Sequence, residues 1–85
     1  MKLDQNINYD GKGKYALINL RTNQVHWGKP HSEHEFFVIK LKDKYASAAL
    51  FAYACAAEAD DPEYAAEVRN LAQRSHNHPY AKQPD

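Results

Sequence analysis

The sequence predicts an α+β domain in which a three-stranded antiparallel sheet precedes an antiparallel two-helix hairpin that packs on one face of the sheet. Polar and apolar residues alternate over residues 14–21 and again over residues 34–41, which is the period of a strand with two different faces. Residues 44–59 contain eight alanines, and a second helical pattern follows Pro62. Because the strands precede the helices in the chain, a sheet covered by helices on one face is the compact arrangement.

The first two strands are expected to form a hairpin. Residues 14–21 turn at Thr22 and Asn23, since asparagine tolerates the left-handed backbone conformation, and residues 24–27 return as a short partner strand. The strongest strand pattern, over residues 34–41, follows a polar connection. The pairing of the middle strand stays open, so the uncovered face receives either Val25 and Trp27 or Gln24 and His26.

The two faces of this sheet differ in what would cover them. The alternation assigns one set of side chains to the helix-facing core, namely Ala16, Ile18, Leu20, Phe37, Ile39 and Leu41. The opposite face would carry Tyr15, Leu17, Phe36 and Val38, flanked by Arg21, Lys40 and Lys42. Such an apolar uncovered face is a candidate interface, unless the N-terminal segment folds back over it through Ile7 and Tyr9.

Two helix starts can be read from local signals. Asp43 is the expected N-cap of a helix over residues 44–59, and Asp61 the expected N-cap of a second helix with Pro62 at its first position. The second helix has an apolar stripe at helical spacing, formed by Tyr64, Val68, Leu71 and Ala72. The first helix is apolar all round, so a second copy of the chain is one candidate to cover it, through Tyr45, Phe51 and Tyr53.

Length and composition allow one domain. Of the 85 residues, we expect residues 1–13 to form a flexible lead-in, residues 14–75 the domain and residues 76–85 a loose tail. The single cysteine excludes an intrachain disulfide, and no signal-peptide or membrane-spanning pattern is seen, so a cytoplasmic protein is expected.

The charges balance in total but not along the chain. Residues 1–42 carry seven basic and four acidic side chains, whereas residues 43–85 carry four and seven. The formal net charge of zero argues against a wholly basic nucleic-acid binder or a wholly acidic mimic of nucleic acid. A basic sheet and an acidic helical hairpin are expected instead.

Catalytic and metal-binding patterns are weak. The histidine pairs His31 with His34 and His76 with His78 have chelating spacings, but a zinc site normally needs four well-placed ligands, so no metal and no other cofactor is expected. Cys55 lies among alanines, where a thiol is usually inert. The sequence therefore predicts a protein that is not an enzyme.

Four segments resemble a set of small bacteriophage-encoded proteins: GKGKYALINLR, EFFVIKLKDKYASAAL, DDPEYAAEVRNLAQR and the closing KQPD. The resemblance covers roughly residues 11–85. It implies a phage setting, a bacterial cytoplasm and an accessory role. It implies no activity and no functional residues.

The expected function is therefore that of a phage accessory protein that binds and modulates a host or defence protein. The contact residues would be Tyr15, Arg21, Trp27, Phe36, Val38, Lys40 and Lys42, with aromatic side chains as anchors. The alternative is a nucleic-acid or nucleotide-binding protein, which would use the same basic and aromatic face for stacking and phosphate contacts. A homodimer that captures a phosphorylated ligand is a variant of this alternative.

Overall fold

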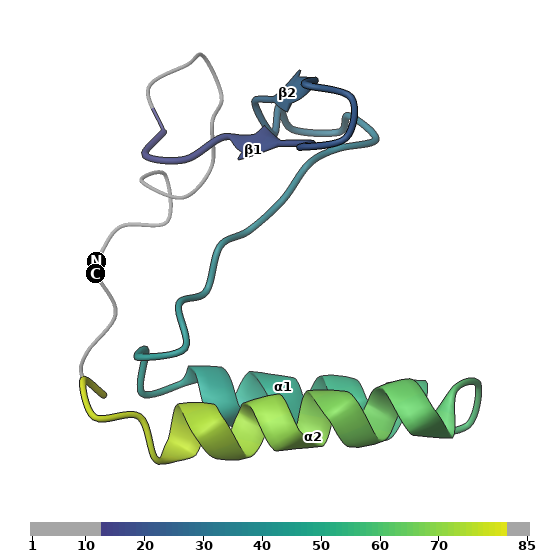
Figure 1. Cartoon of the computed structure of the whole chain (residues 1–85), viewed down its shortest axis with the longest axis vertical. Helices are drawn as coiled ribbons and strands as arrows, with labels where there is room; N and C mark the ends of the chain where they lie inside the picture. Colours follow the sequence, from purple (N-terminus) through teal and green to yellow (C-terminus); the bar gives the residue numbers. More distant parts are fainter. Residues whose placement is uncertain (1–12, 82–85) are drawn as a thin grey trace. The chain divides into compact units, whose positions relative to one another are not determined.

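The computed structural model describes residues 13–81, which comprise two strands and two helices in the order β1, β2, α1, α2 (Figure 1). The chain divides between Val38 and Ile39 into two compact units. The first unit contains the β-hairpin and the second contains the helical hairpin.

The β-hairpin of the first unit is short. Strand β1 (Leu17–Ile18) pairs antiparallel with β2 (Val25–His26), with Leu17 opposite His26 and Ile18 opposite Val25. The Asn19 carboxamide Oδ1 accepts hydrogen bonds from the backbone amides of Arg21, at 2.9 Å, and Thr22, at 3.3 Å. Because an asparagine that bonds the following amides forms a turn, β1 ends three residues earlier than the alternation predicts.

The turn contains the expected residues but is longer than two residues. The Asn19 amide donates to the Gln24 carbonyl at 2.8 Å, and the Asn23 amide donates to the Asn19 carbonyl at 2.7 Å. Asn23 has a φ of 61°, the left-handed conformation expected of it. Leu20 therefore lies in the turn, 86% exposed, which corrects its predicted place on the helix-facing side of the sheet.

The third strand predicted over residues 34–41 is not shown, since β1 and β2 are the two strands within residues 13–81. Turns occupy the start of this stretch instead. The Ser32 amide donates to the Lys29 carbonyl at 3.1 Å, the Glu35 amide to the Ser32 carbonyl at 3.2 Å, and the His31 amide to Glu35 Oε1 at 3.1 Å. These local bonds compete with strand pairing, so alternation alone did not determine the structure of this segment.

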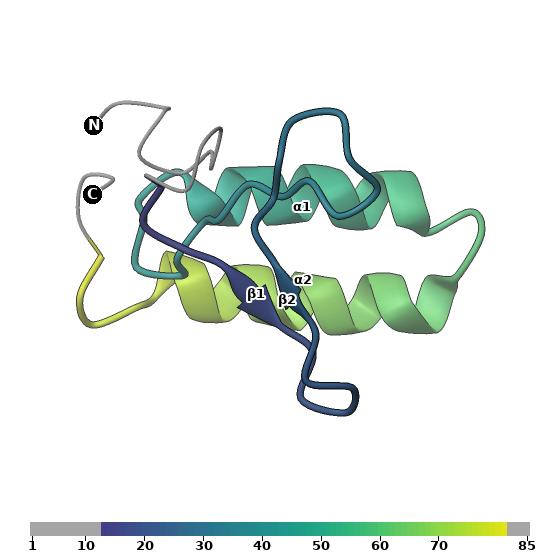
Figure 2. The same ribbon diagram turned by 90° about the horizontal axis from the view of Figure 1, so that it is seen from above.

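The second unit is a hairpin of two antiparallel helices, α1 (Ala46–Ala57) and α2 (Pro62–His76), which lie side by side in both views (Figures 1 and 2). Asp61 is the N-cap of α2 and its carboxylate accepts from the Tyr64 amide at 3.1 Å, with Pro62 at the first helical position, as predicted. A connection of four residues joins the helices, and its Asp60 and Asp61 amides donate to the Ala57 carbonyl.

Helix α1 begins later than predicted. Its N-cap is Tyr45, and the Tyr45 side chain makes no capping hydrogen bond. The Asp43 carboxylate, which was expected to cap the helix, accepts a hydrogen bond from the Tyr45 amide at 2.8 Å. The Ala46 amide donates to the Asp43 carbonyl at 3.0 Å. Asp43 therefore organises a turn that leads into α1, because its side chain binds the second amide after it.

The seam between α1 and α2 consists of small side chains. The buried residues are Ala46 and Ala54 on α1, and Ala65, Val68, Ala72 and Ser75 on α2. Val68 and Ala72 were expected in this stripe, whereas Tyr64 is 43% exposed. The Ser75 hydroxyl donates to the Leu41 carbonyl at 2.7 Å, which ties the segment before α1 to the last turn of α2.

Candidate functional site

The first unit exposes apolar side chains on both sides of its β-hairpin. Residues opposite each other in an antiparallel pair share a face, so the register places His26 on the side of Leu17 and Val25 on the side of Ile18. This pairing selects the option that adds His26 to the Leu17 side. The exposed large apolar residues of the unit are Leu17, Ile18, Leu20, Val25, Trp27 and Phe37. Ile18 and Phe37, which were predicted to face the helices, are exposed on the first unit.

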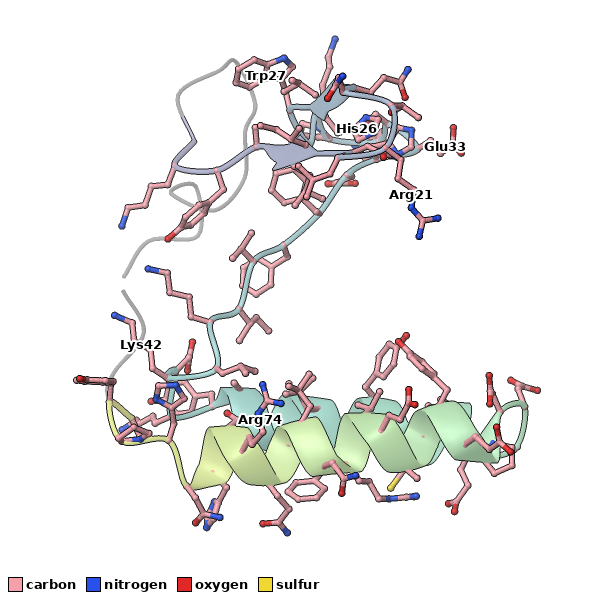
Figure 3. The ribbon with its side chains drawn as sticks, viewed as in Figure 1. Arg21, His26, Trp27, Glu33, Lys42 and Arg74 are labelled. Atoms are coloured by element: carbon pink, nitrogen blue, oxygen red, sulfur yellow. The ribbon has the colours of Figure 1, made fainter. Side chains whose placement is uncertain are left out.

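Trp27 is the most prominent aromatic side chain of this surface, with 60% of its surface exposed (Figure 3). The next residue, Gly28, is buried and has a φ of 71°. A Cβ atom built on Gly28 would lie 2.4 Å from Cε1 of the Phe36 ring, so this ring packs directly on the glycine backbone. Phe36 is consequently half-buried and supports the segment that carries Trp27.

Two histidines stack beside this hairpin. The His26 and His34 rings lie 3.7 Å apart between centroids at an interplanar angle of 25°, and His34 Nε2 lies 3.9 Å from a Glu33 carboxylate oxygen. Both labelled residues His26 and Glu33 can be followed in Figure 3. Within residues 13–81, no three histidine, cysteine or acidic side chains are close enough to hold one metal ion. The stacked rings therefore pack the connection that follows β2 onto the hairpin.

In the second unit, polar links join α1 and α2 outside the alanine seam. Arg69 donates to both carboxylate oxygens of Glu58, at 2.8 and 3.3 Å. The hydrogen bond from Arg69 and its positive charge lower the pKa of Glu58. The hydrogen bond to Glu58 is the largest cause that raises the pKa of Arg69, and the hydrogen bond to Cys55 is the next. The exposed Cys55 thiol thus lies beside a guanidinium that already binds a carboxylate.

A tyrosine pair forms another link. The Tyr53 and Tyr64 hydroxyl oxygens lie 3.1 Å apart, and the rings meet edge to face at 6.1 Å between centroids. The hydrogen bond with Tyr53 raises the pKa of Tyr64. The Tyr53 side chain is therefore oriented by α2 within its own hairpin.

A shallow groove of about 450 Å³ lies along the C-terminal part of α2. Its lining combines a guanidinium, an imidazole and three carboxamides with two apolar side chains, and consists of Leu41, Asn70, Gln73, Arg74, Asn77, His78 and Pro79. Figure 3 shows Arg74 extending from α2. Hydrogen-bond donors without a carboxylate in the lining favour an anionic ligand with several acceptor atoms.

The sequence did not indicate this groove because residues 76–85 were expected to be a loose tail. Residues 77–81 continue in turns after α2. The His78 amide donates to the Ser75 carbonyl and the Ala81 amide to the His78 carbonyl, both at 3.1 Å. The spacing of Asn70, Gln73, Arg74 and Asn77 along one side of a helix was the available signal.

The residues predicted for a single interaction face are divided between the two units. Tyr15, Arg21, Trp27, Phe36 and Val38 belong to the first unit, where Arg21 extends from the turn (Figure 3). Lys40 and Lys42 belong to the second unit, as do the predicted oligomer residues Tyr45, Phe51 and Tyr53. Tyr45 and Tyr53 are exposed and Phe51 is half-buried. The lead-in over residues 1–12, with Ile7 and Tyr9, and the end of the tail over residues 82–85 lie outside the described residues.

Comparisons with protein-family models, with curated proteins and with solved structures find no match for this chain. Among the described residues, neither helix is long and apolar enough to cross a membrane.

Proposed function

We propose that the chain is a non-enzymatic interaction protein that binds and modulates a host or defence protein in a bacterial cytoplasm, the setting implied by its resemblance to phage-encoded proteins. The observation that carries the proposal is the exposure of apolar side chains on both sides of the hairpin formed by β1 and β2. A two-stranded hairpin is at best marginally stable alone, and large apolar side chains left exposed on so small a unit are typical of a protein interface.

Trp27 and Leu20 are the proposed anchors of this contact. Both project from the hairpin with most of their surface exposed, at 60% and 86%. Large side chains that enter pockets of a partner contribute most of the binding energy at interfaces. Arg21 lies next to Leu20 and would steer an acidic partner surface. The expected strand over residues 34–41 is part of the proposal, since a bound partner would favour its pairing at an edge of the hairpin.

The test is affinity capture from a bacterial lysate with wild-type protein, Trp27→Ser and Leu20→Ser. The matched control is Gln24→Ala, which changes an exposed residue of the same connection without removing apolar surface and keeps the backbone hydrogen bonds of the turn. We expect the wild type and Gln24→Ala to retain the same specific protein, and the other two variants to lose most of it. A blue shift of Trp27 fluorescence on adding the purified partner would support direct contact. Equal retention by all four proteins would contradict the proposal.

A second candidate function is favoured by the groove on α2. Its guanidinium, imidazole and carboxamides suit a small phosphorylated ligand such as a nucleotide, and its volume of about 450 Å³ lies in the range of small-molecule sites. Calorimetry with adenosine monophosphate, with inorganic phosphate as a second probe, tests this function. Binding that is lost in Arg74→Ala and kept in Arg21→Ala would support the groove. Absence of binding by the wild type would exclude these ligands.

The nucleic-acid alternative has its own test. Anisotropy of a labelled single-stranded oligonucleotide is measured at increasing salt concentration, with the wild type and with Lys40→Glu combined with Lys42→Glu. A binder that contacts phosphates loses affinity steeply with salt and loses it in the double variant. Salt-independent binding, or no binding, would count against this alternative.

A further inference from the structure

We propose that the groove on α2, with its volume of about 450 Å³, binds a small molecule that carries two or more phosphate groups, such as a nucleoside diphosphate or triphosphate. The phosphates lie at Arg74 and His78, and the rest of the ligand extends along α2 toward Asn70 and Gln73. That the ligand is phosphorylated rests on the second candidate function above. Its charge and its orientation follow from the distribution of charges and hydrogen-bond donors in the helical hairpin.

The charges of the helical hairpin are separated between its two ends. Residues 58–67, which span the connection and the first turns of α2, contain five acidic and no basic side chains. The bond from Ser75 to the Leu41 carbonyl joins the other two stretches, residues 39–46 and 70–81, at the open end of the hairpin. These stretches contain one acidic side chain, Asp43, and four basic ones, Lys40, Lys42, Lys44 and Arg74. Figure 3 shows Lys42 and Arg74 on the half of the hairpin away from the connection.

This positive end favours a ligand with several phosphates. A phosphate monoester carries about 1.5–2 negative charges at pH 7, and each further phosphate adds about one more. The groove lining contains no carboxylate to repel them, and the Asp43 carboxylate binds the Tyr45 amide. Charges attract over about 10 Å at ordinary salt concentrations, so the lysines of this end contribute without touching the ligand. The affinity is therefore expected to increase with the number of phosphates.

The groove lining also offers hydrogen-bond donors that other side chains do not engage. Within residues 13–81, four side chains of the lining have no hydrogen-bond or ion-pair partner: Asn70, Gln73, Arg74 and Asn77. His78 Nδ1 accepts from the Tyr80 amide at 3.1 Å, so the neutral imidazole carries its hydrogen on Nε2 and offers that N–H as a donor. A guanidinium binds two phosphate oxygens at once, which makes Arg74 the principal phosphate ligand.

The acidic side chains determine the direction of the ligand along α2. Glu67 precedes Asn70 by about 4.5 Å along the helix axis, whereas Arg74 follows Asn70 by about 6 Å, at about 1.5 Å per residue. Phosphates are repelled from the side of Glu67 and therefore lie at Arg74 and His78. The carboxamides of Asn70 and Gln73 both donate and accept hydrogen bonds, which suits the uncharged part of the ligand, such as the edge of a base.

Calorimetry of the full chain tests the number of phosphates. Adenosine and its mono-, di- and triphosphate are compared at constant ionic strength without magnesium, and the guanosine series is measured in the same way. We expect the affinity to rise by about 3-fold or more with each added phosphate, the equivalent of one or two exposed ion pairs. Equal dissociation constants for the mono- and triphosphate in both series would overturn this inference and leave the second candidate function standing. Absence of binding by all of these ligands would overturn both.

Charge-removing variants test the place of the phosphates. Arg74→Gln should weaken triphosphate binding by about 5-fold or more and bring the mono- and triphosphate affinities closer together, and Lys42→Gln should act in the same direction. The matched control Arg21→Gln removes the same charge from the first unit and should bind as the wild type does. An equal loss in Arg21→Gln would indicate attraction by the chain as a whole and overturn the proposal. Far-UV circular dichroism verifies that the helices are retained.

NMR spectroscopy of side-chain N–H groups tests the orientation. Adenosine triphosphate should shift the signals of Arg74 and of the Asn70 and Gln73 carboxamides, whereas tripolyphosphate, which lacks the nucleoside, should shift that of Arg74 alone. The Gln24 carboxamide of the first unit serves as the control and should not move. Equal shifts of Asn70 and Gln73 with both ligands would overturn the proposed orientation. Displacement of the triphosphate by a single-stranded oligonucleotide at the same nucleotide concentration would assign the groove to nucleic acid and overturn the proposal.

Discussion

Gly28→Ala tests how the first unit holds Trp27 in place. The added methyl group meets two separate obstacles. At a φ of 71° an alanine is disfavoured relative to glycine by about 1–2 kcal/mol. In addition, the new Cβ would lie 2.4, 2.7 and 2.9 Å from three carbon atoms of the Phe36 ring. Forcing a ring out of a packed position typically costs about 1–3 kcal/mol. We therefore expect a loss of about 2–5 kcal/mol of stability in the first unit.

The two units can be followed separately in one urea titration. Trp27 is the single tryptophan and lies in the first unit, while the helices that dominate far-UV circular dichroism lie in the second. Gly28→Ala is expected to shift the Trp27 fluorescence transition to lower urea concentration, or to abolish it. The circular dichroism transition should stay in place.

A double-mutant cycle with Phe36→Ala separates the two costs. Removing the ring removes the clash, so Gly28→Ala in that background should cost only about 1–2 kcal/mol, the part due to the backbone. If Gly28→Ala leaves the Trp27 transition unchanged, the packing of Phe36 on Gly28 is not important for stability. If it costs the same with and without the Phe36 ring, the steric part of the reasoning is refuted.

Three further predictions concern the helical hairpin. Ser75→Ala should lower the free energy of unfolding by about 1 kcal/mol in urea titrations followed by circular dichroism, because the Leu41 carbonyl loses its partner at 2.7 Å; an unchanged midpoint would contradict this. Asp61→Ala should cost about 1 kcal/mol in the same assay through loss of the α2 cap, and Asp61→Asn, which keeps an acceptor, should cost less. The lowered pKa of Glu58 means that its pair with Arg69 stabilises the fold above the ordinary pKa near 4.5, and that this contribution is lost as the pH falls through the lowered value. NMR titration of the Glu58 carboxyl group should show the pKa returning to its ordinary range in Arg69→Ala, and an unmoved pKa would exclude the pair as the cause.

The second unit could be predicted from the sequence because its signals are local. Asp61 and Pro62 mark a helix start within one turn of chain, and both act as expected. The start of α1 was misplaced because Asp43 has two uses for its carboxylate, as a helix cap or in a turn, and the turn is formed. Local patterns thus identify both helices and leave an uncertainty of two residues at a boundary.

The first unit was harder to predict because a strand depends on its partner. Alternation over residues 34–41 describes a side-chain pattern, but the hydrogen bonds around Ser32 and Glu35 hold the start of this stretch in turns. The Asn19 side chain similarly shortens β1. The candidate surfaces follow from these details. The exposure of Leu20 results from the early turn, and the packing of Phe36 on Gly28 joins residues that no short-range pattern connects.

The alanine seam has a consequence for the alignment of α1 and α2. Methyl groups interlock poorly, so a lengthwise displacement by one helical turn, about 5.4 Å, would exchange one alanine contact for another at little cost. The links at the edges of the seam do not tolerate such a displacement, since the contacts from Arg69 to Glu58 and from Ser75 to Leu41 are 2.8 and 2.7 Å long. The polar links therefore act together with the four-residue connection to hold the register of the two helices. Their successive removal should leave a pair that stays helical and associated but is less narrowly aligned.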